Sequence, residues 1–177
     1  TYRLPLYDRD PLMIEARLLL DGYFPYSLGR QPTAAETAKF EELWDALIIR
    51  LSASQTGLVL RDFHSPNIIW CPSLSGLSRI GLVDIQDALQ GPLSYDVSSL
   101  AQDARVSLSK ELETKIVQTY VLARKRSGEF DADLFAQAYA ITALQRATKI
   151  AGIFVRLDRR DGKPDYLKHL PRIEDYI

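Results

Sequence analysis

Most apolar positions of this chain recur at the three- and four-residue spacing of amphipathic helices. A first helix is predicted from Asp10 through the segment MIEARLLL, and GYFPYSLGRQP (22–32) after it is predicted to be a loop. Thr33 and Glu36 form a capping-box pattern at the start of a second helix. The core-facing stripe of that helix would contain Phe40, Leu43, Trp44, Leu47, Ile48 and Leu51.

The hydrophobic period changes in the middle of the chain. The runs LVL (58–60), NIIWC (67–71) and RIGLVD (79–84) are short, apolar and bounded by Gly, Pro or Ser, which predicts three short buried strands. The segment PSLSGLS (72–78) would close a hairpin between the second and third strands. Cys71 is predicted to be a small buried hydrophobe.

The chain is predicted to be helical again after Ser94. We expect a helix over 94–105, a second after Ser109 and a long third from near Asp131 to about Leu157. The second of these carries Leu112, Ile116 and Tyr120 on one face. The tail RRDGKPDYLKHLPRIEDYI (159–177) is predicted to be loop plus a short helix. This pattern favours an α+β fold that is mainly helical with a small β insertion.

Composition narrows the function classes. Of 177 residues, 46% are hydrophobic and 25% charged, which suits one well-packed domain. The net charge of −1 offers no basic field for nucleic acid, and no apolar run reaches the ~18 residues of a membrane span. The segment TYRLPLYDRD lacks the pattern of a secretion signal, and a single cysteine permits no internal disulfide. We therefore expect a cytoplasmic protein without nucleic-acid or membrane partners.

Polar residues are crowded into the loop LRDFHSPN (60–67), between two predicted strands. A second polar segment, DIQD (84–87), directly follows the third strand. Because a hairpin reverses the chain, Asp62 and Asp84 are expected to lie at the same edge of the predicted strands. A carboxylate that accepts a hydroxyl proton, with an amide oxygen and a second carboxylate to hold Mg²⁺, is what phosphoryl transfer requires. Asp and Asn also form turns and caps, so the D-x4-N motif alone is a weak indication of function. The full order of strand, D-x4-N loop, hairpin and final Asp is a specific one.

These segments resemble known motifs. LRDFHSPN resembles the catalytic loop H-x-D-x-x-x-x-N of protein kinases and, more closely, H-x-D-x-H-x-x-N of aminoglycoside phosphotransferases and related small-molecule kinases. DIQD resembles the magnesium-binding segment of that family, and GPLSYDVSSL (91–100) resembles the element that follows it. The C-terminal region 145–173 is similar to bacterial anomeric kinases of N-acetylmuramate and N-acetylglucosamine, which make sugar 1-phosphates from ATP. The resemblance implies a protein-kinase-like C-terminal lobe over residues 1–177, whose β-hairpin carries the catalytic and metal-binding loops.

The resemblance also implies roles for individual residues. Asp62 would be the catalytic base, and Asn67 and Asp84 would bind Mg²⁺ against the phosphates of ATP. His64 would either organise the loop or contact substrate, and Asp96 would accept hydrogen bonds from the loop backbone. Arg61 would support the loop or face phosphate. The polar candidates for substrate contact or support are Glu15, Gln86, Asp87 and Arg156, and His169 is predicted to be surface or structural.

The sequence departs from the family pattern in two ways. Leu60 stands where the first histidine of the motif is expected, and the chain contains no glycine-rich phosphate loop with a strand lysine. We expect those parts in an N-terminal ATP-covering lobe outside this chain. Without that lobe, LPLYDRD and the strand edges would be partly bare, so self-association through this face is plausible.

Several functions stay open from sequence alone. The first is an ATP- and Mg²⁺-dependent kinase of a small hydroxyl substrate, with the anomeric hydroxyl of an amino sugar in cell-wall recycling preferred. Another substrate of aminoglycoside, choline or homoserine type is an alternative, although the balance of 23 acidic and 22 basic residues shows no excess acid for a polycation. A non-catalytic kinase-like binding lobe is a further alternative, and a metal-dependent nuclease is a distant one.

Overall fold

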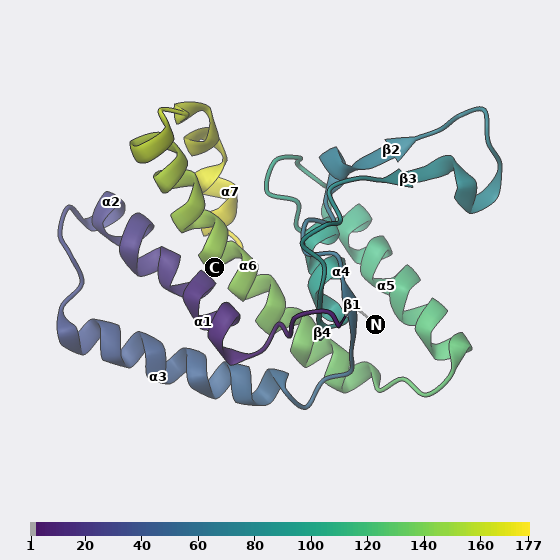
Figure 1. Ribbon diagram of the computed structural model, residues 1–177, viewed down its shortest axis with the longest axis horizontal. Coiled ribbons are helices and arrows are strands. Elements are labelled where there is room, and N and C mark those ends of the chain that lie inside the picture. Colours follow the sequence, from purple (N-terminus) through teal and green to yellow (C-terminus); the bar gives the residue numbers. More distant parts are fainter. Residues whose placement is uncertain (1–2) are drawn as a thin grey trace.

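The long helix α6 (Ala132–Asp161) is the element around which the molecule is arranged (Figure 1). The structure is a computed structural model that describes residues 3–177. Helices α1 (Arg9–Leu18) and α3 (Ala34–Leu51) lie on one side of α6, and the small sheets and α5 (Lys110–Ser127) lie on the other. The predicted mainly helical α+β architecture is confirmed, and the β structure consists of two-stranded antiparallel sheets.

The segment after α1 differs from its prediction. Instead of a loop over 22–32, the chain continues through a π-helical turn, Leu19–Tyr23, into α2 (Phe24–Leu28). Gly22 suggested a break, but it serves close helix packing: a Cβ at Gly22 would lie 2.9 Å from the carbonyl oxygen of Gly152 on α6. A Cβ at Gly152 would lie 2.0 Å from the carbonyl oxygen of Leu18. The two helices can therefore cross only where both lack side chains.

Helix α3 begins with the predicted capping box. The Thr33 side chain accepts a hydrogen bond from the Glu36 amide at 3.2 Å, and the Glu36 carboxylate accepts one from the Thr33 amide at 2.8 Å. Trp44, Ile48 and Leu51 are buried as expected. Leu43 is 54% exposed, so its assignment to the core was wrong. The buried face of α3 is a narrow i, i+4, i+7 stripe, which excludes Leu43.

The strands form two separate pairs. The strand β1 (Thr56–Val59) pairs with β4 (Leu89–Pro92), which was not predicted because its Gly and Pro are poor strand formers. The predicted hairpin is confirmed as β2 (Ile68–Trp70) and β3 (Ile80–Leu82), joined by a turn that includes a 3₁₀ segment, Gly76–Arg79. It projects from the body of the molecule (Figure 1).

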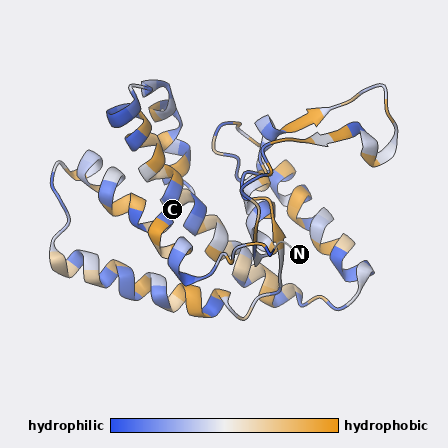
Figure 2. Cartoon of the chain, in the orientation of Figure 1, coloured by the Kyte–Doolittle hydropathy of each residue, from blue (hydrophilic) through white to orange (hydrophobic). Residues whose placement is uncertain are grey.

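The prediction that this hairpin is buried was wrong. Ile69 is 48% exposed and Trp70 is 59% exposed, and Cys71 is only partly buried. Figure 2 shows these hydrophobic strands standing clear of the helices. No element within residues 3–177 covers both faces of this hairpin. Its apolar composition therefore does not predict that its side chains are buried in this chain.

The C-terminal half is close to its prediction. Helix α4 (Ser94–Ala101) ends before residue 105, because the Asp103 carboxylate accepts hydrogen bonds from the next backbone amides and turns the chain. Helix α6 ends at Asp161, where Gly162 adopts a left-handed conformation with φ of 63°. A 3₁₀ segment, Pro164–His169, and α7 (Leu170–Glu174) complete the tail. No helix within the described residues is long and apolar enough to cross a membrane.

Candidate active site

The polar loop after β1 is held by a carboxylate of α4. The backbone amides of Leu60 and Arg61 donate hydrogen bonds to the two carboxylate oxygens of Asp96, at 2.7 Å and 3.0 Å. Arg61 has a φ of 72°, a left-handed conformation that costs about 1–2 kcal/mol for a residue with a Cβ. The hydrogen bonds that Asp96 accepts stabilise this turn, which leads the chain into Asp62. Leu60 takes part through its backbone, so the turn forms without a histidine at that position.

A second carboxylate, Asp103, holds the far side of the loop. It is 1% exposed and accepts a hydrogen bond from the Ser65 amide at 2.8 Å, besides those from Arg105 and Val106. Burial alone would raise the pKa of Asp103, but the hydrogen bonds from Arg105 and Ser65 outweigh it, so its pKa is lowered. Sequence reasoning missed Asp103, whose only local signal was an Asp just past the end of a helix.

Asn67 joins the loop to the base of the hairpin. Its side-chain amide donates to the Asp62 backbone carbonyl at 2.9 Å and to an Asp84 carboxylate oxygen at 3.4 Å, and the Asn67 backbone carbonyl accepts from the Val83 backbone amide at 3.1 Å. Asp84 itself has a left-handed φ of 61°. The structure therefore brings Asp62, Asn67 and Asp84 together, as their order in the sequence suggested.

The Asp84 carboxylate suits a magnesium ion, because its exposure leaves room for the waters that Mg²⁺ retains. Asn67 is adjacent but turns its amide nitrogen toward Asp84, so its carboxamide would have to rotate to offer an oxygen to the same ion. Gln86 donates its side-chain amide to the other Asp84 oxygen at 2.5 Å. Asp87 is exposed on the same segment. Gln86 and Asp87 thus lie on the hairpin side of the site.

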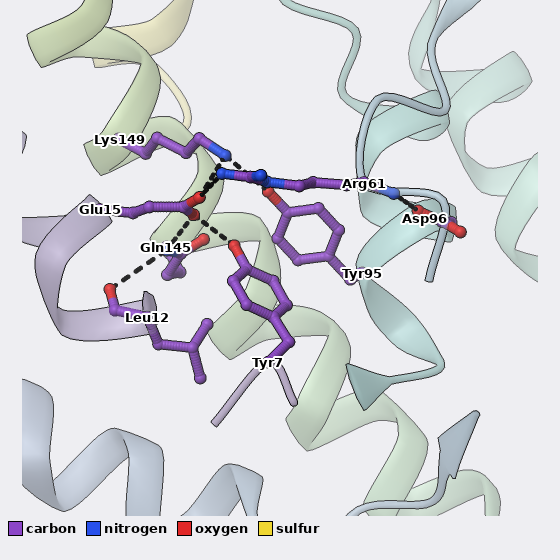
Figure 3. Close-up of polar contacts among 8 residues, drawn as sticks. All are labelled: Tyr7, Leu12, Glu15, Arg61, Tyr95, Asp96, Gln145 and Lys149. Carbon is purple, nitrogen blue, oxygen red and sulfur yellow. Dashed lines mark hydrogen bonds and ion pairs between the residues drawn. The ribbon is translucent and has the colours of Figure 1, made fainter. Parts of the chain in front are cut away.

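Glu15 lies in a buried polar cluster rather than on an open surface. It is 6% exposed and accepts hydrogen bonds from Lys149 at 2.9 Å, from Arg61 at 2.5 Å, from Gln145 at 3.2 Å and from the Tyr7 hydroxyl (Figure 3). Burial raises the pKa of Glu15, but Lys149 and these hydrogen bonds outweigh it, so its pKa is lowered. Of its two predicted roles, substrate contact and support, this geometry fits support: Glu15 ties α1, α6 and Arg61 together.

A cavity of about 90 Å³ lies beside Asp62. Arg61, Asp62 and His64 form its loop wall, and three further cations face it: Arg105 from the α4–α5 connection, and Arg146 and Lys149 from α6. Its remaining lining residues are Tyr95, Asp103, Ala104, Ile150, Ile153 and Phe154. Sequence reasoning missed the three cations, although the spacing of Arg146, Lys149, Ile150 and Ile153 places the two α6 cations on one helical face with these apolar residues.

Two other predicted residues are placed less centrally. Arg156 is exposed and does not line this cavity, so the structure separates it from Asp62. His169 is partly buried, with its ring 6.0 Å from that of Phe154, which agrees with a structural position. His64 lines the cavity, and its Nδ1 is buried without a hydrogen-bond partner within residues 3–177.

Comparison with known sequences decides the family. The profile of the phosphotransferase enzyme family matches residues 4–132, which include Asp62, Asn67 and Asp84. This chain belongs to the phosphotransferase enzyme family. The matched region ends before Arg146 and Lys149, so the α6 wall of the cavity lies outside it.

Individual members of this phosphotransferase family are similar over more of the chain. The N-acetylmuramate/N-acetylglucosamine kinase of Caulobacter vibrioides is 36% identical over 144 residues, which are 81% of this chain and 39% of that protein. The proteins of the same name from Neisseria meningitidis and Pseudomonas aeruginosa are 33% and 31% identical over 98% of this chain, and over 52% and 51% of their own lengths. The chain thus spans about half the length of the curated relatives it matches.

Proposed function

We propose that this chain is the C-terminal lobe of a kinase that transfers the γ-phosphoryl group of ATP to the anomeric hydroxyl of an amino sugar. The observation that carries the proposal is the grouping of Asp62, Asn67 and Asp84 around one loop, beside a polar cavity. The names of the relatives support N-acetylmuramate or N-acetylglucosamine as the acceptor. A cytoplasmic role in recycling cell-wall sugars would follow from that substrate.

The proposed chemistry assigns each group one task. Asp62 accepts the proton of the acceptor hydroxyl while the oxygen of that hydroxyl forms a bond to the γ-phosphorus of ATP. The bond between the γ-phosphorus and the β,γ-bridging oxygen breaks, and ADP leaves. Asn67 and Asp84 would hold Mg²⁺, which supplies charge neutralisation on the phosphate oxygens. Asp96 and Asp103 position the loop through its backbone amides.

The proposal includes an N-terminal lobe that covers ATP. Within this chain each small sheet carries an exposed apolar side chain, Leu58 on β1 at 58% and Trp70 on β2 at 59%, and a second lobe would cover such side chains. Association of two copies through the same face is the alternative prediction, which sedimentation of this chain alone would test.

The experiment uses the complete protein with ATP, Mg²⁺ and each acceptor in turn. We expect ³¹P NMR to show a sugar 1-phosphate, with no product from an aminoglycoside, choline or homoserine. Asp62→Asn should lower kcat by about 10²- to 10⁴-fold, the usual contribution of a general base. Asp133→Asn, the same change at an exposed site on the first turn of α6, should leave kcat unchanged. Full activity in Asp62→Asn would contradict the proposal, and absence of nucleotide binding would favour a non-catalytic lobe.

A further inference from the structure

Arg146 is a nearly buried cation that no described residue pairs with directly, although its charge opposes the rise that burial causes in the pKa of the Asp96 carboxyl. It is 6% exposed and lines the cavity beside Asp62. Among residues 3–177 it forms no ion pair or hydrogen bond, and its guanidinium carbon lies 6.0 Å from the centre of the Tyr95 ring. Burying a charge without a partner is costly, so such a group is retained where a ligand supplies the missing charge.

Two other cations of the cavity, Arg61 of the loop and Lys149 of α6, are already paired. Arg61 and Lys149 both donate to Glu15, which fixes their charges within the chain (Figure 3). Arg146 is therefore the cation of α6 that remains available to a ligand. Its planar guanidinium suits a carboxylate, which it can bind through two parallel hydrogen bonds.

Two neighbours strengthen the case for an anion. Arg105 lines the same cavity from the α4–α5 connection, with its guanidinium over the Tyr166 ring at 5.8 Å and no ion pair to a described residue. The buried Nδ1 of His64 also lacks a partner. A histidine ring nitrogen can form one hydrogen bond to a ligand, so this buried Nδ1 offers a further contact inside the cavity.

The cavity lies on the acceptor side of Asp62. Its walls are the loop 61–64, the α4–α5 connection and α6, and no residue of the β2–β3 hairpin lines it. Asn67 directly precedes β2 and Asp84 follows β3, so these two residues, which would hold the metal and phosphates, lie at the base of that hairpin. An anion bound by Arg146 therefore belongs to the phosphoryl acceptor and not to the nucleotide.

We propose that Arg146, assisted by Arg105 and His64, binds a carboxylate of the acceptor sugar and makes the site selective for acidic amino sugars. This inference rests on the proposed function. The two sugars in the relatives' names differ in this respect, since N-acetylmuramate carries a lactyl ether carboxylate and N-acetylglucosamine has none. The residue thus determines specificity, while Asp62 carries out the proton transfer on either sugar.

The test measures steady-state kinetics of the complete protein with three acceptors: N-acetylmuramate, its methyl ester and N-acetylglucosamine. For the unaltered protein we expect the KM of the acid to be lower than that of the ester by roughly 10- to 100-fold, the usual effect of a charge-assisted hydrogen bond. In Arg146→Met the KM of the acid should rise to that of the ester. The KM values of the ester, N-acetylglucosamine and ATP should stay unchanged, and Arg146→Lys should restore part of the preference.

Several results would overturn the inference. One is an equal KM of the unaltered protein for N-acetylmuramate and its methyl ester, a result that requires no variant. A second is a rise in the KM of ATP in Arg146→Met, which would assign the anion to the nucleotide phosphates, and a third is the same loss on all three acceptors. If Arg146→Met does not fold, Arg105→Gln replaces an exposed side chain and should raise the KM of the acid alone by about 3- to 10-fold. Absence of product from every sugar would instead refute the proposed function itself.

Discussion

The two sides of Asp62 are built in contrasting ways. On the α6 side, Glu15 is buried and accepts four hydrogen bonds that join α1, α6 and the loop. On the hairpin side, Asp84 is exposed and accepts hydrogen bonds only from the side-chain amides of Asn67 and Gln86, within residues 3–177. Groups that are already ordered bind a ligand without a further loss of conformational entropy. Under the proposed function, this chain alone would complete the acceptor side, whereas ATP, metal and the proposed N-terminal lobe would complete the nucleotide side.

Removing the charge of Glu15 should break the ordered side most severely. Glu15→Gln leaves Lys149 and Arg61 without their shared carboxylate, and loss of one partner of a buried ion pair typically costs about 3–5 kcal/mol. We expect a fall of that size in the free energy of unfolding, measured by urea denaturation. A change below about 1 kcal/mol would show that the cluster does not stabilise this side.

Acid should reproduce that loss. The folded pKa of Glu15 lies below its ordinary value of 4.5, because Lys149 and the hydrogen bonds outweigh burial. Its contribution is therefore complete above pH 4.5 and is lost as pH falls below 4.5 through the folded pKa. The difference in unfolding free energy between the unaltered protein and Glu15→Gln should shrink over that interval. A constant difference from pH 6 to pH 3 would contradict the assignment.

On the hairpin side we expect a substitution to lower activity with little effect on stability. Asp84→Asn should lower kcat by on the order of 10²-fold, since the proposed metal ligand would be weakened. Its free energy of unfolding should change by no more than about 0.5 kcal/mol, because the side chain is exposed. Kinetics over a Mg²⁺ titration, with urea denaturation of the same sample, checks both. Loss of stability equal to that of Glu15→Gln would remove the distinction between the two sides.

A pair of glycine substitutions compares the packing of the two sides directly. Gly152→Ala places a Cβ against the Leu18 carbonyl at 2.0 Å and should cost about 1–3 kcal/mol or more, as overpacking does. Gly81→Ala on β3 meets its nearest atom, of Ile69, at 3.4 Å, and should change stability by less than about 0.5 kcal/mol. Thermal unfolding of both variants is sufficient. Equal effects would mean that the α1–α6 crossing is not the tighter contact.

The features that were predictable from sequence are local. The capping box of Thr33 and Glu36, the β2–β3 hairpin and the loop with Asp62 and Asn67 each depend on residues a few positions apart. The cluster around Glu15 joins it to Gln145 and Lys149, 130 and 134 positions away, and no local pattern encodes such contacts. Gly22 shows a different limit, because a glycine that permits close helix packing looks in sequence like a glycine that ends a helix.

The smallest expected effect concerns His64, which lies at the boundary between the two sides. Burial, then the charge of Arg105, lowers the pKa of His64 below its ordinary value of 6.5, against the opposing charges of Asp103 and Asp62. The neutral ring therefore stabilises the fold fully above pH 6.5, and this contribution is lost as pH falls below 6.5 through the folded pKa. Because the side chain is partly exposed, we expect less than about 1 kcal/mol. Unfolding free energies of the unaltered protein and His64→Gln should therefore diverge only slightly between pH 7 and pH 5.5, with the unaltered protein losing more. A larger loss in His64→Gln would mean that charged His64 is the stabilised form, and that a carboxylate rather than Arg105 controls this wall of the cavity.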